Sequence, residues 1–288
     1  MDALKLEPAA TLGTRRLSDV LNRAYADYFM PIQLDRIQFQ LICEEQDVDL
    51  ERSVVALEGG SPVGIALLSR RGSEGWVSGV GVRPQWRRRG IAREMMLWLQ
   101  RTAQECGLRR VRLDVLEQNE GAIALYKSLG FNHVRDLLVL MLEPYAAVRR
   151  SPVADIKPER PARLLQAYKR FHDVVSCWQR DVQSIRKRLG FMMGVAFTEE
   201  QDLRGYIVYL SQMDGFAVMD LAVDPTHPQR LEVAQALLLA LPEMQLSQGG
   251  HVTNVPEEDP LLPAYMEVGY RVWYRQREMA WSPTSSLH

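Results

Sequence analysis

Hydrophobic and polar positions follow two different periods along the first 148 residues. Apolar side chains recur every three or four positions at 15–29 and at 35–46, which predicts two amphipathic helices. Two apolar runs, 53–57 and 63–68, flank a turn that contains two glycines and a proline, and this is typical of a β-hairpin. Further strands are expected at 4–7, 76–82, 111–116 and 137–142, and further helices at 90–106 and 120–129.

The same succession of elements returns in the second half. Residues 149–163 contain three prolines among charged side chains and predict a linker. Beyond it we expect a helix at 164–189, strands at 190–197, 205–210 and 216–223, a helix at 231–241 and a closing strand at 270–281. Because a pattern repeated at long period indicates a duplicated unit, we predict two domains, 1–148 and 164–288, joined by the linker 149–163.

Composition agrees with two globular domains and excludes several classes. A chain of 288 residues fits two domains of ordinary size. Its net charge of −1 gives no general reason to expect nucleic acid or an anionic membrane as a partner. No apolar run is long enough to span a bilayer, and the first residues lack the pattern of a signal peptide. Cys43, Cys106 and Cys177 are widely spaced and the histidines are scattered, so we expect reduced thiols, no metal site and a cytoplasmic location.

One segment of the first half has the composition of a phosphate-binding loop. A strand with two interior glycines, Gly79 and Gly81, leads through a turn into residues 87–92 and then into a helix. A helix N-terminus presents unpaired N–H groups and a partial positive charge, and the small residues Gly90 and Ala92 allow close approach of an anion. The three arginines at 87–89 do not decide by themselves between a solvated turn, nucleic acid and phosphate.

Residues 80–92 resemble the coenzyme signature of the GNAT superfamily of N-acetyltransferases. In that signature a strand ending in hydrophobic-x-Val precedes (Gln/Arg)-x-x-Gly-x-(Gly/Ala), and Arg87, Gly90 and Ala92 match its fixed positions. The resemblance implies that loop amides hold the pyrophosphate of acetyl-coenzyme A, that the strand separates from its neighbour there, and that its backbone bonds the pantetheine arm. The coenzyme-binding residues that it implies are Val80, Val82, Arg87, Arg88, Arg89, Gly90, Ile91, Ala92 and Asn119.

Residues 113–131 are similar to the second conserved segment of the same superfamily. They hold a strand, Asn119, an alanine three residues later, then Leu-Tyr and Leu-Gly-Phe. Asn119 is also well placed to cap its helix, and both roles stay open. Tyr126 could simply pack in the core, but the resemblance implies that it is the general acid that protonates the departing thiolate. The resemblance covers roughly residues 3–145 and implies an α/β (α+β) chain of two tandem GNAT-like domains, each a mixed central sheet flanked by helices.

The second half keeps the strand end of this motif but not its loop. When Val223 is aligned with Val82, the places of Arg87, Gly90 and Ala92 are taken by a proline and two bulky residues. These residues are Pro228, Leu231 and Val233. We therefore expect a degenerate copy with a structural duty.

The expected function is an acetyl-coenzyme A-dependent N-acetyltransferase whose active site lies in the first domain. Its acceptor is a small-molecule or peptide amine that the sequence does not identify. Asp114 and Glu117 are equally well explained as a general base or as surface charges, and the aromatic residues at 25, 28 and 29 as an acceptor pocket or as core. The alternative is a non-catalytic acyl-coenzyme A sensor or interaction module, and a homodimer is left open.

Overall fold

The computed structural model describes residues 3–30, 32–144, 155–213, 215–244 and 249–283. The chain divides into two compact units, each with its own cores. The first unit contains Met1–Val134 and Arg277–His288, and the second contains Arg135–Gln276. None of the helices within these described ranges is long and apolar enough to cross a membrane.

The first unit is built on a mixed sheet with the strand order β1-β2-β3-β4-β5, next to which lies the end of β12. Strands β4 and β5 pair in parallel, and β1 to β4 pair antiparallel with their neighbours in this order. Its strands are β1 (Lys5–Pro8), β2 (Val54–Glu58), β3 (Ser61–Arg71), β4 (Glu74–Val82), β5 (Arg110–Leu116) and residues 277–281 of β12 (Arg271–Trp281). Its helices are α1 (Thr14–Ala24), α2 (Arg36–Glu45), α3 (Ile91–Glu105) and α4 (Glu120–Ser128), with 3-10 turns at Ala9–Thr11 and Pro84–Trp86.

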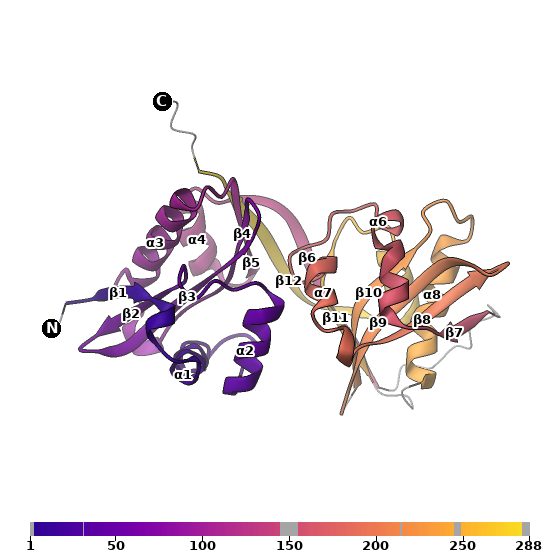
Figure 1. The fold of residues 1–288 in the computed structure, drawn as a ribbon, viewed down its shortest axis with the longest axis horizontal. Coiled ribbons are helices and arrows are strands. Elements are labelled where there is room, and N and C mark those ends of the chain that lie inside the picture. The colour runs from indigo at the N-terminus through magenta and orange to yellow at the C-terminus, as the bar shows by residue number, and fades with distance from the viewer. Residues whose placement is uncertain (1–2, 31, 145–154, 214, 245–248, 284–288) are drawn as a thin grey trace. The chain divides into compact units, whose positions relative to one another are not determined.

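Helices cover both faces of this sheet (Figure 1). On one face α1 and α2 bury a core that includes Leu17 and Phe39, and Asp35 begins α2 with a capping box. On the other face α3 and α4 bury a second core that includes Met95 and Met96. The apolar period of these helices therefore predicted their buried faces correctly.

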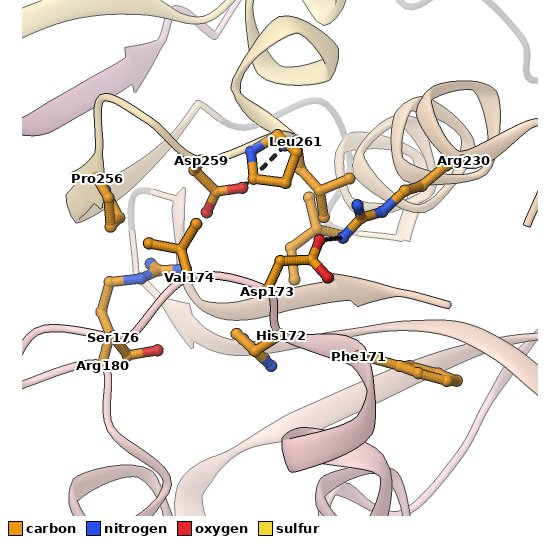
Figure 2. A pocket seen from close by; sticks show the side chains of 12 residues that line it. Phe171, His172, Asp173, Val174, Ser176, Arg180, Arg230, Pro256, Asp259 and Leu261 are labelled. Carbon is orange, nitrogen blue, oxygen red and sulfur yellow. Dashed lines mark hydrogen bonds and ion pairs between the residues drawn. The ribbon is translucent and has the colours of Figure 1, made fainter. Parts of the chain in front are cut away.

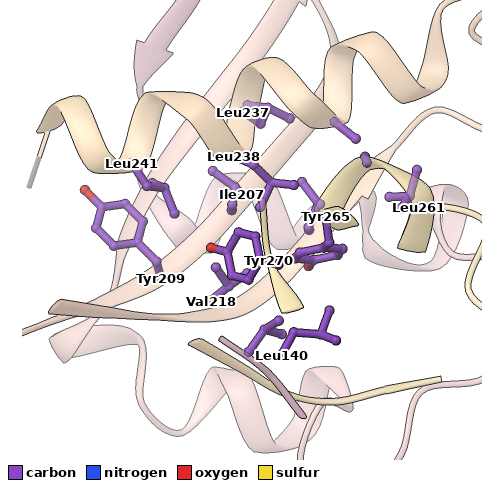
Figure 3. Close-up of a cluster of buried hydrophobic side chains, with 14 of the residues drawn as sticks. Leu140, Ile207, Tyr209, Val218, Leu237, Leu238, Leu241, Leu261, Tyr265 and Tyr270 are labelled. Carbon is purple, nitrogen blue, oxygen red and sulfur yellow. The ribbon is translucent and has the colours of Figure 1, made fainter. Parts of the chain in front are cut away.

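The second unit repeats this plan with the strand order β6-β11-β10-β9-β8-β7, in which only β10 and β11 pair in parallel. Figure 3 shows its main core, where α8 and α9 pack on the sheet. Its strands are β6 (Asn132–Leu142), β7 (Ile156–Pro158), β8 (Met193–Glu199), β9 (Asp202–Gln212), β10 (Gly215–Val223) and β11 (Gly250–Pro256). Its helices are α5 (Pro161–Leu164), α6 (Tyr168–Phe171), α7 (Val182–Arg186), α8 (Arg230–Met244) and α9 (Leu262–Val268), with 3-10 turns at Leu165–Ala167 and Leu189–Phe191.

The two units exchange a strand relative to the predicted limits of 1–148 and 164–288. Most of β6 belongs to the second unit, where it pairs with β11 from Leu137 to Leu142 and buries Leu140 in the core (Figure 3). The end of β12 belongs instead to the first unit, where Met279 is fully buried. Alternating apolar and polar residues show that one face of a strand is buried, but they do not show which of two sheets the strand joins. Of the predicted linker 149–163, residues 149–154 lie outside the described residues, and the rest holds β7 and the start of α5.

The prediction of one long helix at 164–189 was wrong. Short helices and 3-10 turns occupy this segment, and residues 172–181 are not helical. Their polar groups bond to one another instead: the Tyr168 hydroxyl lies 2.6 Å from Ser176 Oγ and 3.0 Å from the Arg180 carbonyl, and Ser184 donates to the Trp178 carbonyl at 2.7 Å. These tertiary contacts override the local helical pattern.

Two irregular details recur at matching places in both units. Ser78 of β4 has no partner in β3, because Val77 pairs with Leu68 and Gly79 with Leu67. Met219 of β10 is skipped in the same way between residues 218 and 220. The parallel pairing also stops just before each bulge, at Val77 in the first unit and at the matching residue 218 in the second. A bulge is specified by local sequence, so its repetition supports duplication more strongly than element order alone.

The helix that follows the parallel strand ends alike in both units. Gly130 has φ +84° after α4, and Gly269 has φ +112° after α9, a backbone region that favours glycine. The next amide then bonds back to a helical tyrosine carbonyl at 3.0 Å in each case. These tyrosines are Tyr126 and Tyr265, so the sequence echo between them has a structural counterpart.

Candidate functional site

Strands β4 and β5 separate in the middle of the first sheet. Their parallel pairing covers Glu74–Val77 and Arg110–Leu113, although β4 continues to Val82 and β5 to Leu116. The bulge at Ser78 lies where the pairing ends. The strands therefore part where the family resemblance implies that they do, and the β4 backbone beyond Val77 no longer bonds to β5.

Tyr25, which follows α1, lies at this opening. Its hydroxyl donates to the Val80 carbonyl at 3.0 Å and accepts from the Val80 amide at 3.2 Å. A Cβ added to Gly81 would lie 2.7 Å from the Ala24 Cβ and 2.9 Å from the Tyr25 ring. Gly81 is therefore required for the close approach of the end of α1 to β4, and the Val80 backbone groups are held by a side chain.

Arg87 clamps the loop to the same end of α1. Its guanidinium donates to the Val82 carbonyl at 3.0 Å, to the Ala24 carbonyl at 3.0 Å and to both carboxylate oxygens of Asp27 at 2.8 and 2.6 Å. The hydrogen bond from Arg87 holds the pKa of the Asp27 carboxyl below its usual value. The side chain of Arg87 thus orders protein groups, and its role toward the coenzyme stays a prediction.

The loop leaves a run of backbone amides without protein acceptors. Among the described residues, no hydrogen bond is donated by the amides of residues 88–93. Gly90 is the N-cap of α3 with φ +80°, no side chain caps the helix, and the space beside Gly90 is open. Arg88 also has a positive φ of +65°, which turns the loop sharply. Exposed amides at a helix N-terminus form an anion-binding site.

The arginines of the loop differ in what they contact. The Arg89 guanidinium lies 4.7 Å from the Trp86 ring centroid and 3.6 Å from a Glu58 carboxylate oxygen, and Arg93 donates to the Ser128 hydroxyl at 3.1 Å. The Arg88 side chain makes no ion pair or hydrogen bond with any residue that the structure describes. Its charge is therefore available to a bound anion.

Tyr126 lies inside the first unit with 8% of its surface exposed. Burial raises the pKa of its hydroxyl, and Tyr25 and Tyr28 add to the effect. The hydroxyl is therefore protonated at neutral pH and is a weaker acid than an exposed tyrosine. Its ring centroid lies 6.0 Å from that of Phe131, so Tyr126 also packs in the core.

Asn119 caps α4, because its side-chain oxygen accepts from the Ala122 amide at 3.3 Å. The capping role is confirmed, and contact with the coenzyme stays a prediction. Of the two candidate bases, Glu117 pairs with Arg277 at 2.9 Å, and Asp114 also interacts with other residues. Neither carboxylate is free, and within the described ranges no group of three or more potential ligands could hold a metal ion.

The matching loop of the second unit bonds to itself. The Asp224 carboxylate accepts from the Thr226 amide at 3.0 Å and from its hydroxyl at 2.8 Å, and the Asp224 carbonyl accepts from the His227 amide at 3.0 Å. The Gln229 amide donates to His227 Nδ1 at 3.1 Å, and Pro228 has no N–H group. Of the amides that correspond to residues 88–93, those of Gln229 and Val233 are therefore bonded within the second unit.

Charged side chains of the second unit fill the region beside this loop (Figure 2). Arg230 reaches Asp173 at 2.5 Å, and Arg180, His172 and Asp259 line the same pocket. The cavity that remains is about 20 Å³, which is room for about one water molecule. It cannot admit a ligand of nucleotide size without rearrangement.

A mixed sheet that parts at a bulge beside an uncapped, arginine-rich helix start is the arrangement that the family resemblance implies. Residues 15–131 match the family described as Acetyltransferase (GNAT) family. The first unit therefore contains a domain of the GNAT acetyltransferase family, whose members generally use acetyl-coenzyme A.

Solved structures extend the likeness of fold to both units. The chain is similar to a tandem GNAT protein from the clavulanic acid biosynthesis pathway (15% identity, 99% of this chain and 100% of the other covered, TM-score 0.74). It is also similar to a GCN5-related N-acetyltransferase from Sphaerobacter thermophilus (16%, 97% and 95%, 0.71) and a putative acetyltransferase from Pyrococcus horikoshii (16%, 99% and 91%, 0.67). At these identities the comparison shows the fold alone, and the fold is the predicted α/β tandem of two GNAT-like domains.

Proposed function

We propose that the first unit binds acetyl-coenzyme A through the loop at 87–92 and transfers its acetyl group to an amine. The observation that carries this proposal is the run of amides at 88–93, which have no protein acceptor, at the start of α3 and beside the unpaired charge of Arg88. A pyrophosphate would supply acceptors for these donors and a counter-charge for the arginine. The residues present therefore fit the coenzyme.

Each part of the loop has its own task in this proposal. The amides of residues 88–92 hold the pyrophosphate, and Gly90 keeps the space in front of them open. Arg87 acts as a positioning residue, because its contacts with Val82, Ala24 and Asp27 fix the loop against β4. The backbone at 80 and 82 borders the opening of the sheet, and a ligand amide that bonds Val80 must displace the Tyr25 hydroxyl.

The proton chemistry falls to Tyr126. Acetyl-coenzyme A supplies an activated thioester whose carbonyl a neutral amine attacks, so that an amide forms and the carbon–sulfur bond breaks. The departing thiolate takes a proton from the Tyr126 hydroxyl, and the proton that the amine nitrogen loses as the amide forms restores that hydroxyl. Glu117 and Asp114, the two carboxylates considered as the base, both have partners, so in this proposal the amine loses its proton to solvent or arrives neutral.

The second unit carries no coenzyme in this proposal. Pro228 offers no donor, and the Gln229 amide, which corresponds to that of Arg88, is bonded to His227. The bulky Leu231 and Val233 take the places of Gly90 and Ala92. Arg230, which corresponds to Arg89, is paired with Asp173. We therefore expect one equivalent of acetyl-coenzyme A to bind per chain.

The test uses a matched pair of tyrosines. Tyr126→Phe should lower amine-dependent release of coenzyme A thiol by about 10²–10⁴-fold and leave coenzyme binding intact. Tyr265→Phe, at the corresponding place in the second unit, should turn over like the wild type. Calorimetry in parallel should give one equivalent of acetyl-coenzyme A, and two equivalents would refute the assignment of a single site. Binding of one equivalent without thiol release from any primary amine would favour the acyl-coenzyme A sensor instead.

A further inference from the structure

A pocket of about 390 Å³ lies in the first unit between α1, α2 and β4. Its wall is formed mainly by apolar and aromatic side chains, among them Tyr25, Leu34 and Ile42. The polar side chains in the lining are Gln33, Gln46 and Ser78, and no charged residue is among those that line it. Its size suits a small organic group rather than a sugar chain or a folded partner.

This pocket is continuous with the opening between β4 and β5. Ser78 and Gly79 line it, and they are the bulge residues at which β4 leaves β5. Tyr25 lines it too, and its hydroxyl bonds both backbone groups of Val80 in the opening. A molecule in the pocket therefore reaches the strand along which we propose that the pantetheine arm lies.

One polar group in the pocket wall has no protein partner. The Ser78 hydroxyl oxygen is buried and forms no hydrogen bond with the described residues. A buried hydroxyl without a partner is unfavourable, so its position favours a ligand that supplies one. This oxygen has almost no surface accessible from the pocket, so an amine nitrogen would bond to it only after a small shift of the wall.

We infer that the acceptor is a primary monoamine carried on an aromatic or branched aliphatic body. The inference rests on the proposed function, and it follows from a pocket lined mainly by apolar side chains, with the uncharged polar groups of Gln33, Gln46 and Ser78 and no carboxylate. A second ammonium group would lose its water inside the pocket without gaining a counter-charge, which excludes polyamines and aminosugars with several amines.

The first test compares acceptors that differ by one charge. Acetylation of butylamine should exceed that of 1,4-diaminobutane by at least about tenfold in kcat/KM, because only the diamine buries a second cation. 2-Phenylethylamine should be better than butylamine, since each added buried carbon contributes roughly a fourfold gain. Equal use of butylamine and 1,4-diaminobutane would overturn the inference while leaving the acetyltransferase itself established.

A second test moves a charge into the pocket. Ile42→Asp should lower kcat/KM for butylamine by at least about tenfold and shift the preference toward 1,4-diaminobutane. Ile37→Asp is the matched control, because Ile37 lies on the same helix, is 60% exposed and is outside the pocket lining. Gln46→Glu adds a charge with almost no change of shape and gives the same readout if Ile42→Asp fails to fold. Identical amine preferences in the wild type and in both pocket variants would refute the assignment.

Binding separates this inference from the proposed function. In calorimetry with coenzyme A present, 2-phenylethylamine should bind to the wild type and to Ile37→Asp and bind more weakly to Ile42→Asp. If this holds but no amine is acetylated, the acetyltransferase proposal fails and the pocket assignment stands. If polyamines alone are acetylated, the pocket assignment fails and the acetyltransferase proposal stands.

Discussion

Met279 offers a direct test of how the chain is divided into units. It lies near the end of β12, is 0% exposed, and packs in the core that α3 and α4 cover in the first unit. Replacing a fully buried methionine by alanine costs about 2–5 kcal/mol, through lost burial and the cavity left behind. That cost is a large part of the ordinary stability of a domain, about 5–15 kcal/mol.

The effect of Met279→Ala should appear far away in sequence. A loss of about 2–5 kcal/mol accelerates amide exchange through global opening by about 30- to 5,000-fold, and it lowers the melting temperature of a unit of this size by about 4–20 °C. Hydrogen exchange read by peptide should therefore speed up in α3 and β5. It should stay unchanged in β10 and α8, which belong to the second unit.

Val272→Ala is the control on the same strand. Val272 is 40% exposed and belongs to the second unit, so its loss should change stability by at most about 1 kcal/mol. If Met279→Ala instead accelerated amide exchange in β10 and α8, β12 would belong wholly to the second unit. The predicted limits of 1–148 and 164–288 would then describe the chain better than the division found in the structure.

Three further predictions concern individual groups. Gly90→Glu should weaken acetyl-coenzyme A binding by at least about 100-fold, because the new carboxylate repels and obstructs the pyrophosphate. Gly107→Glu is the control: Gly107 has a similar φ of +67° and is equally open, so this variant should show only the cost of backbone strain. Equal affinities of the two variants, measured by calorimetry, would contradict the loop assignment. Ser78→Ala removes a buried hydroxyl without a partner and should melt at the same or a higher temperature, and a clear loss of stability would show that the hydroxyl is satisfied. Burial opposes the charge of His172, but the charge and hydrogen bond of Asp220, 3.0 Å away, outweigh it and raise the pKa of His172. The stability that this pair contributes is complete below about pH 6.5 and is lost as the pH rises through the raised pKa of His172. The urea concentration at which half of the second unit is unfolded should therefore fall between pH 6 and 8.5 in the wild type, and it should fall less in His172→Gln. If it falls equally in both proteins, other groups cause the loss of stability.

The sequence was most informative where chemistry depends on local backbone. Gly90, with its positive φ, and the small residues around it predicted an open helix start from their order alone. The glycines in β4 indicated a bulge or a close approach, and both are present: Ser78 is the bulge and Gly81 admits the end of α1. Such features are readable because neighbours along the chain determine them.

The sequence was least informative where the partner is distant. The contacts of Arg87 depend on Ala24 and Asp27, about sixty residues earlier, so the motif could suggest a phosphate contact but not a clamp. The sequence also did not predict that the Ser78 hydroxyl lacks a partner, because that depends on distant residues. The neighbouring glycines were the only sign of an irregularity at this place. The exchange of β6 and β12 was also missed, because a buried strand carries the same pattern in either sheet.

The place of β12 also bears on how the protein is made. Once Gln276 has been joined to the chain, every residue assigned to the second unit has been synthesised, whereas the first unit still lacks the residues from Arg277 on. Domains are usually expected to fold in the order of synthesis. Here the half that emerges first must wait, with a sheet edge open beside β5, until the last residues arrive. A chain that stops before Arg277 would therefore hold every residue of the second unit but lack the strand that lies beside β5 in the first.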